Sequence, residues 1–99
     1  MNVEFDPEAE LEFLEAIVFL EGRAPGLGDA FAREVYATIS RISERPEAWP
    51  AYGLDTRRHF TRRFPYSIIY SIESDIIAIW AIAHMSRDEY YWASRRDED

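Results

Sequence analysis

Hydrophobic residues near the start of the chain first alternate and then take up a helical spacing. Residues 2–5 alternate over a short stretch, which predicts an N-terminal strand. Asp6 and Pro7 then form a helix start, because Asp caps the first amides and the missing N–H of proline costs nothing there. A first helix is expected from this point to Gly22, with its apolar positions at Phe13, Leu14, Ile17, Val18 and Leu20. Three acids lie on another face, which is interpreted as solvated: Glu8, Glu12 and Glu15.

A second helix follows a break rich in glycine and proline over residues 22–28. It is expected from about Asp29 to Arg45, where Pro46 ends it. Its apolar positions keep helical spacing: Phe31, Val35, Ile39 and Ile42. Two amphipathic helices joined by a short loop predict an antiparallel hairpin whose apolar stripes need a further surface to cover.

The second half of the chain carries the period of β-strands. After a loop from Pro46 to Leu54, strands are predicted over residues 56–63, 66–73 and 76–84. Ser67 and Ser71 alternate with apolar neighbours, which predicts a sheet with one covered face and one more open face. The order β-αα-βββ predicts one α+β domain over residues 1–99, in which a helix hairpin packs on a mostly antiparallel sheet. The charged residues 95–99 are expected to fray.

Composition narrows the classes of function. The chain has no cysteine and a net charge of −8, of which −7 falls in residues 1–50 and −1 in residues 51–99. This charge argues against nucleic-acid binding by the chain alone, because phosphate contacts need accumulated positive charge. The longest apolar run, Ile76 to Ala83, is too short to cross a membrane, and the N-terminus lacks a secretion signal, so a cytoplasmic location is expected. No cofactor is predicted.

The basic residues are all arginine, and four of them fall within residues 57–63. In an extended strand Arg57 and Arg63 point to one face, while Arg58 and Arg62 point to the other. Such a cluster can bind phosphates or a carboxylate-rich partner. The alternative is that half are ordinary surface arginines and the rest pair with acids of the first helix.

Aromatic and histidine positions complete the candidate chemistry. Phe64-Pro65-Tyr66 forms a corner before a strand, and Tyr66 and Tyr70 are expected in the core. His84 ends the last strand and is more often a structural group there than a base. With His59 as the one other histidine and no metal-ligand spacing, no metal site is predicted. Arg87 precedes Tyr91 and Trp92, which can stack on bases or pack the tail against the sheet edge.

In this order the features resemble the RelE/ParE superfamily of toxins from bacterial type II toxin–antitoxin systems. The branch they resemble most is the ParE-like one, whose members are often described as plasmid-stabilisation proteins. The resemblance implies the same β-αα-βββ fold, with Pro25 to Gly28 as the inter-helix loop. The chain departs from the nuclease members in two ways: Ser67 stands where they carry a basic residue, and there is no lysine. It also departs from the His-x-x-Arg-x-Pro-x-Tyr-Trp pattern of the family, because Glu89 replaces the proline.

Three hypotheses follow from the resemblance. The preferred one is a growth-inhibiting toxin that binds a target protein, by analogy DNA gyrase, and is neutralised by a cognate antitoxin. The second is a metal-independent, ribosome-dependent mRNA endoribonuclease, with Arg58, Arg62, Arg87 and Tyr91 as candidate catalytic residues. The third is a non-toxic binding module or regulator. Residues expected to bind the target or antitoxin are Arg57, Arg58, Arg62, Arg63, His84, Arg87, Tyr91 and Trp92.

Overall fold

The N-terminal strand and the first helix are joined by a capped turn. The structure, a computed structural model that describes residues 1–96, places β1 at Asn2–Phe5 and α1 at Pro7–Arg23. The Asp6 carboxylate accepts hydrogen bonds from the amides of Glu8 (3.0 Å) and Ala9 (3.3 Å). These two amides would otherwise lack partners in the first turn of the helix. The predicted strand and helix start are therefore confirmed.

The second helix, α2, spans Leu27–Glu44 and begins two residues before the predicted start. The reason lies in α1, where the Glu21 carboxylate accepts hydrogen bonds from the amides of Gly26 (2.8 Å) and Gly28 (2.9 Å). These bonds lower the pKa of Glu21, and the negative charge favours the start of a helix. Gly28 also lets the helices approach closely, because a Cβ there would lie 2.5 Å from the Ile17 carbonyl oxygen. This cap comes from another element, so the local pattern did not reveal it.

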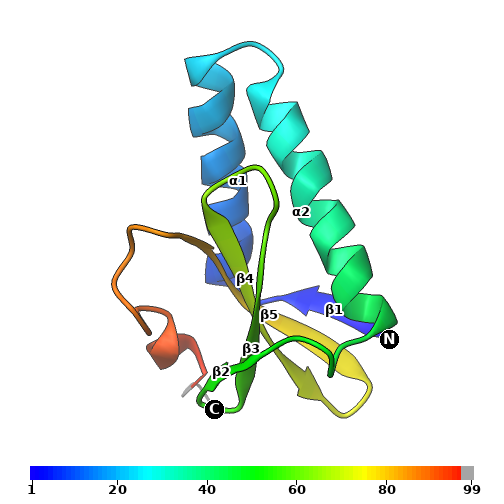
Figure 1. Cartoon of the computed structure of the whole chain (residues 1–99). Coiled ribbons are helices and arrows are strands. Elements are labelled where there is room, and N and C mark those ends of the chain that lie inside the picture. The colour runs from blue at the N-terminus through cyan, green and yellow to red at the C-terminus, as the bar shows by residue number, and fades with distance from the viewer. Residues whose placement is uncertain (97–99) are drawn as a thin grey trace.

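The strands form one twisted sheet beneath the helix hairpin (Figure 1). Within residues 1–96 the strands are β1, β2 (Ala51–Gly53), β3 (Thr56–Phe60), β4 (Tyr66–Glu73) and β5 (Ile76–His84), in the order β1-β5-β4-β3-β2. Neighbours are antiparallel except β1 and β5, which are parallel. The predicted α+β class and mostly antiparallel sheet are confirmed. Two details differ: β2 occupies part of the predicted loop, and β3 ends at Phe60 instead of residue 63.

A bulge at Trp80 decides which residues of β5 enter the main core. The register pairs Ile69 with Ala81 and Tyr70 with Ile79, so Trp80 is left without a partner on β4. The extra residue reverses which positions of β5 face the helices, so even-numbered positions face them after the bulge and odd-numbered positions before it. On either side of the bulge Ile77, Ile79 and Ile82 therefore all face the helices. They pack there with Tyr66, Ile68 and Tyr70, which confirms the core positions expected for the two tyrosines.

The sheet face opposite the helices is covered by the C-terminal segment. Trp92 is 1% exposed and packs against Ile69, Ala81 and Ala83, just before a short 3₁₀ helix at Ala93–Arg95. The prediction of a more open face was wrong, because the aromatic tail folds back onto it. Fraying from residue 95 was also wrong for Arg95 itself, whose side chain is 8% exposed; residues 97–99 lie outside the described part of the chain.

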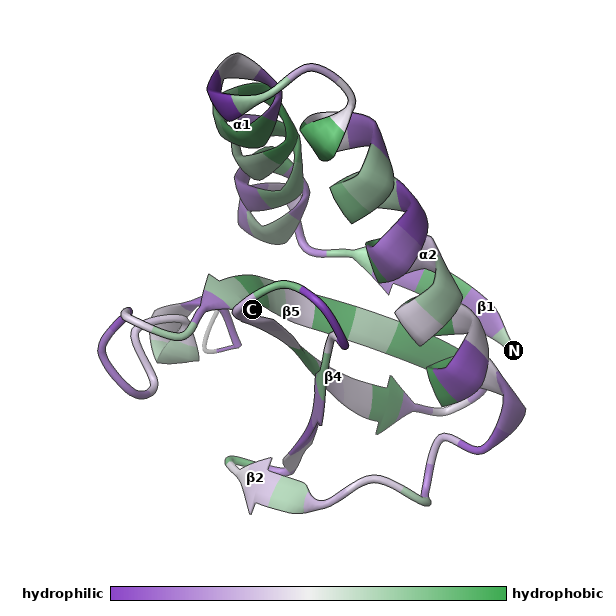
Figure 2. Cartoon of the chain, turned by 45° about the horizontal axis from the view of Figure 1, so that its top comes forward, coloured by the Kyte–Doolittle hydropathy of each residue, from purple (hydrophilic) through white to green (hydrophobic). Residues whose placement is uncertain are grey.

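The outer face of α1 departs from the predicted pattern. Phe13 and Ala16 are buried, as expected for the core stripe, but Leu14 and Val18 are 53% and 73% exposed. The hairpin extends beyond the sheet, and green hydrophobic residues occupy consecutive turns of α1 (Figures 1 and 2). Helical spacing identified α1 correctly but assigned too many of its residues to the core.

Candidate functional site

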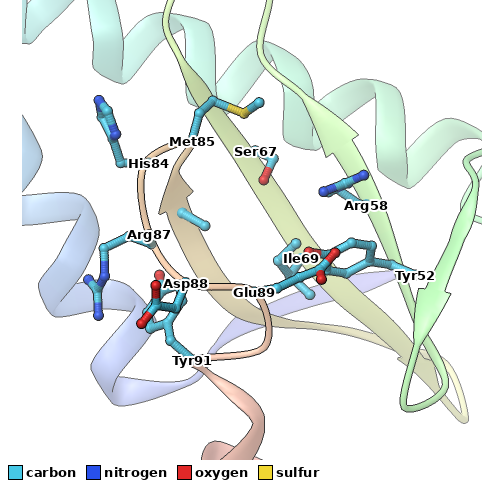
Figure 3. Close-up of a pocket in the computed structure, with 11 residues that line it drawn as sticks. Tyr52, Arg58, Ser67, Ile69, His84, Met85, Arg87, Asp88, Glu89 and Tyr91 are labelled. Carbon is cyan, nitrogen blue, oxygen red and sulfur yellow. The ribbon is translucent and has the colours of Figure 1, made fainter.

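A pocket of about 250 Å³ opens on the sheet face opposite the helices, between β3, β4, the end of β5 and the tail (Figure 3). We call it the tail-side pocket. It is lined by Tyr52, Arg58, Ser67, Ile69, Ala83, His84, Met85, Arg87, Asp88, Glu89 and Tyr91. Arg58 and Arg87 stand at opposite sides of it in Figure 3. Of the candidate residues, the structure brings Arg58, His84, Arg87 and Tyr91 together here and leaves Arg57, Arg62, Arg63 and Trp92 out.

The two arginines at the start of β3 have different roles. The Arg58 guanidinium lies over the rings of Tyr52 (4.0 Å) and Phe60 (4.7 Å), and these contacts hold its charge beside the pocket. Arg57 donates hydrogen bonds to the carbonyls of Glu47 (3.0 Å) and Trp49 (2.8 Å), so it fixes the loop that leads into β2. As predicted, the two arginines point to opposite faces of the sheet. Arg58 lines the tail-side pocket, and Arg57 does not.

Arg62 and Arg63 belong to the loop between β3 and β4 and not to a strand. The buried Thr61 hydroxyl donates to the Phe64 carbonyl (2.7 Å), which closes the turn and ends β3 early. Glu34 of α2 accepts a hydrogen bond from the Arg62 amide (2.5 Å) and lies 3.7 Å from the Arg63 guanidinium. Both side chains are exposed, and neither lines the pocket. The expected four-arginine surface is therefore divided.

Tyr91 is tied to Glu12 of α1. Its hydroxyl donates to the Glu12 carboxylate (2.5 Å), and burial together with that acid raises the pKa of Tyr91 well above its ordinary value. Arg95 donates two further bonds to the same carboxylate (3.0 Å each), and the Ile82 amide donates another (3.1 Å). Glu12, expected on a solvated face, is in fact the residue that joins α1, β5 and the tail.

Arg87 and His84 shape the exit from β5. The Arg87 guanidinium lies 3.8 Å from the Tyr91 ring centroid and 3.8 Å from the Glu12 carboxylate. His84 is exposed; its Nδ1 accepts a hydrogen bond from the Ser86 amide (3.0 Å) and lies 2.8 Å from the Ser86 hydroxyl. His84 thus stabilises the turn that delivers Arg87 to the pocket.

The tail contributes residues that sequence reasoning did not select. Tyr90 has a φ of 62°, which turns the chain so that its hydroxyl donates to the Tyr52 carbonyl (2.9 Å). Its ring stacks on Tyr52 at 5.2 Å, and both rings lie beside Trp92. Trp92, expected to bind a partner, is buried and packs the core of this face instead.

The pocket presents charges of both signs. Arg58 and Arg87 share it with Asp88 and Glu89, and burial raises the pKa of Tyr52, an effect to which Glu89 adds. Such a lining suits the recognition of a polar partner through charge-assisted hydrogen bonds. Within residues 1–96, no three His, Asp or Glu side chains are grouped so that they could hold a metal ion. Among the same residues, no helix is long and apolar enough to span a bilayer.

Comparison with known proteins places this fold in a family. The chain matches the model of the ParE toxin of the type II toxin–antitoxin system, parDE, over residues 3–89. The chain belongs to the ParE toxin family. A solved structure from P. aeruginosa, the chromosomal ParDE TA system, is similar in fold, with a TM-score of 0.69, 15% identity, and coverage of 87% of this chain and 97% of that one. A search of curated proteins found no significant match.

The ParE family match ends at Glu89, so the aromatic tail lies beyond it. The contacts of Tyr90, Tyr91 and Trp92 therefore come from the structure of this chain and not from the match. Glu12 lies within the matched region, and its spacing from two alanines of α1 could have indicated its place in the fold. It is three residues after Ala9 and four before Ala16, both buried, which places its carboxylate at the border of the core.

Proposed function

We propose that this ParE-family chain is the toxin of a bacterial type II pair and inhibits growth in the cytoplasm by binding a target protein, by family analogy DNA gyrase. A cognate antitoxin would neutralise it. The tail-side pocket, with Arg58 and Arg87 at its sides, would contact the target.

The observation that supports binding over catalysis is the state of Tyr91. A general base must be able to lose its proton near neutral pH. The Tyr91 hydroxyl donates to Glu12, and its raised pKa keeps it protonated. Arg62, a further catalytic candidate, does not line the pocket. Of the four catalytic candidates Arg58 and Arg87 then remain, and neither guanidinium can act as the base that an mRNA cleavage needs.

The experiment is controlled expression of the chain alone in a bacterial host. If a gyrase-like target is bound, growth should stop, cells should form filaments and the DNA-damage response should be induced. Arrest of translation with messages cut at the ribosome would replace this proposal with the endoribonuclease. Normal growth at full expression would favour a non-toxic binding module.

Paired variants test the proposed surface. Arg58→Ala with Arg87→Ala should lower the toxicity at least tenfold, measured as survival on inducer. Arg33→Ala, an exposed arginine of α2 that pairs with Asp29, is the matched control and should leave toxicity unchanged. Equal toxicity of both variants at equal protein level would exclude the pocket as the target-binding surface.

A further inference from the structure

The lining of the tail-side pocket includes a buried hydroxyl group that no other protein group binds. Ser67 of β4 is 4% exposed, and in Figure 3 its oxygen is turned toward the space that the labelled side chains surround. Within residues 1–96 this hydroxyl makes no hydrogen bond to another side chain or to the backbone. Buried polar groups are normally hydrogen-bonded, so the partner of this hydroxyl must come from the pocket itself.

Ser71 shows how the same strand uses a hydroxyl that serves the fold. It lies on the same face four residues further along and is 2% exposed. Its oxygen accepts hydrogen bonds from the Trp80 indole (2.8 Å) and from Arg96 (2.9 Å), and it donates to the Glu73 carboxylate (2.6 Å). Ser67 is buried to a similar extent but has none of these contacts. The difference indicates that the Ser67 hydroxyl serves a ligand of the pocket.

Arg58 of β3 supplies a positive charge to the same part of the pocket. The register pairs Arg58 with Ile69, so Arg58 is a diagonal neighbour of Ser67 on one face of the sheet. Its guanidinium lies over the rings of Tyr52 and Phe60, which contact the faces of the group and leave the N–H donors in its plane. Among the residues that the structure describes, no carboxylate lies within 4.0 Å of this guanidinium. Arg58 is therefore a positioned cation whose donors are available to an anion.

Two acids on the rim limit which anion can enter. Asp88 and Glu89 line the same pocket, and the chain carries a net charge of −8. A nucleic acid has a phosphate at every nucleotide, so its neighbouring phosphates would meet these acids. A single carboxylate on a polypeptide is instead flanked by backbone N–H groups, which can donate to them. The volume of about 250 Å³ is also below the range of about 300–1,000 Å³ for sites that enclose a whole small molecule, and it suits one side chain.

We propose that Arg58 and Ser67 bind the carboxylate of an aspartate or glutamate on the target protein. The guanidinium and the hydroxyl donate to the carboxylate oxygens, while Asp88 and Glu89 accept hydrogen bonds from the backbone beside that residue. This inference rests on the proposed function, which supplies a protein target, and it adds the chemistry that the target must present. Charge-assisted hydrogen bonds inside a pocket fix the orientation of a partner and select against a neutral one.

Two small probes that differ in one group test this chemistry on the full chain. N-acetylglutamate amide carries the carboxylate between peptide-like groups, and N-acetylglutamine amide is its neutral equivalent. In an NMR titration at low salt, the Ser67 amide and the Arg58 Nε–H signals should shift with the glutamate probe. Its dissociation constant should be at least tenfold lower than that of the glutamine probe. Equal affinity of the two probes, or no shift with either, would overturn the proposal.

A third probe tests the competing kind of anion. The dinucleotide UpU presents one phosphate between two bases. It should bind more weakly than the glutamate probe, because the bases offer fewer donors to Asp88 and Glu89 than a peptide backbone does. Tighter binding of UpU at the Ser67 and Arg58 signals would assign the pocket to a nucleic acid and refute the carboxylate.

Two serine variants distinguish a ligand contact from a structural role. Ser67→Ala should weaken binding of the glutamate probe at least fivefold and leave the melting temperature unchanged, because no protein group loses a hydrogen bond. Ser71→Ala should do the reverse, since it removes three hydrogen bonds outside the pocket. Arg58→Gln should weaken binding at least tenfold, whereas Arg33→Gln, an exposed change on α2, should leave the affinity within twofold. Equal probe affinity of the two serine variants would remove Ser67 from the site.

Growth assays separate this inference from the proposed function. At equal protein level, the Arg58→Gln and Ser67→Ala chains should each be at least threefold less toxic than the parent. A parent chain without toxicity would refute the proposed function, and the probe titrations would still decide whether the pocket binds a carboxylate. A toxic parent whose Arg58→Gln and Ser67→Ala variants are equally toxic would refute the carboxylate contact and leave the toxin assignment standing.

Discussion

At the scale of single residues, Glu12 joins α1 to β5 and to the tail through its carboxylate. Its carboxylate receives hydrogen bonds from Tyr91, from Arg95 and from the Ile82 amide, while its side chain is 14% exposed. A partly buried acid that accepts four hydrogen bonds is stable only while those donors remain, and the donors depend equally on the acid. The tail is therefore held on the sheet by polar contacts as well as by Trp92.

Removal of the Glu12 carboxylate should leave the buried Arg95 guanidinium without its partner. We expect Glu12→Ala to lower the free energy of unfolding by about 3 kcal/mol, the usual cost of breaking a buried ion pair. Urea denaturation followed by tryptophan fluorescence measures it. Glu15→Ala, an exposed acid one turn further along α1, should change stability by less than about 0.5 kcal/mol. Equal effects would show that the Glu12 network adds nothing.

At the scale of elements, the edge strand β2 and the tail depend on each other. Gly53 ends β2 with a φ of 102°, and a Cβ there would lie 2.7 Å from the Tyr90 hydroxyl oxygen. That hydroxyl in turn binds the Tyr52 carbonyl. The tail therefore contacts β2 directly, and the absence of a side chain at residue 53 leaves room for the Tyr90 hydroxyl.

Substitution of Gly53 should therefore affect two elements together. Gly53→Ala is expected to lower the free energy of unfolding by about 1–3 kcal/mol, since alanine is strained at positive φ and its methyl group meets Tyr90. Gly22→Ala, inside α1 with open space around it, should instead stabilise by up to about 1 kcal/mol. Thermal unfolding of both variants is the measurement. A stabilised Gly53→Ala chain would contradict the described contact between β2 and the tail.

At the scale of the whole molecule, the cations are all arginine, so they keep their charge when lysines would lose theirs. The groups that titrate in strongly alkaline solution are then the tyrosines. Burial raises the pKa of Tyr70 from its ordinary value of 10.0 to about 12, and its hydroxyl donates to the Pro46 carbonyl (2.5 Å).

Alkaline stability should follow from this shift. A group whose pKa is raised on folding stabilises the fold fully below its unfolded pKa and loses that contribution as pH rises through its folded pKa. Between pH 10 and about 12 the free energy of unfolding should fall by about 3 kcal/mol from Tyr70. Tyr70→Phe should be less stable at pH 7 but should show a shallower alkaline decline. Identical slopes would place the titrating group elsewhere.

Much of the fold could be predicted because its elements carry their own signals. The cap at Asp6, the helical spacing of Phe31 and Val35, and the alternation around Ile68 are local. The Trp80 bulge could not be predicted, because the run from Ile76 to Ala83 is apolar throughout and contains no polar residue to mark a change of face. Strand β2 has three residues and is defined by its pairing with β3. Three residues are too few to show an alternating pattern that would predict a strand.

The candidate site was predicted less completely, for a related reason. Arg58, Arg87 and Tyr91 line one pocket because β3, the exit of β5 and the tail converge, and their residue types were sufficient to select them. Glu12 is about 80 residues away from Tyr91 in the chain, and a carboxylate on an amphipathic helix is usually solvated. Trp92 was predicted to bind a partner. An aromatic residue near arginines can either contact a partner or pack in the core, and its burial shows that it packs in the core.

The pairing of β1 with β5 joins the two strands of the described sheet that are farthest apart along the chain. Asn2 finds its partner at Ile76, so β1 has no place in the sheet until β5 has emerged from the ribosome. Contacts so distant along the chain delay folding, and an incomplete product lacks the strand that lies between β1 and β4. The tail-side pocket closes later still, when Tyr91 reaches Glu12. A fragment that ends before β5 would therefore carry neither the completed sheet nor the pocket.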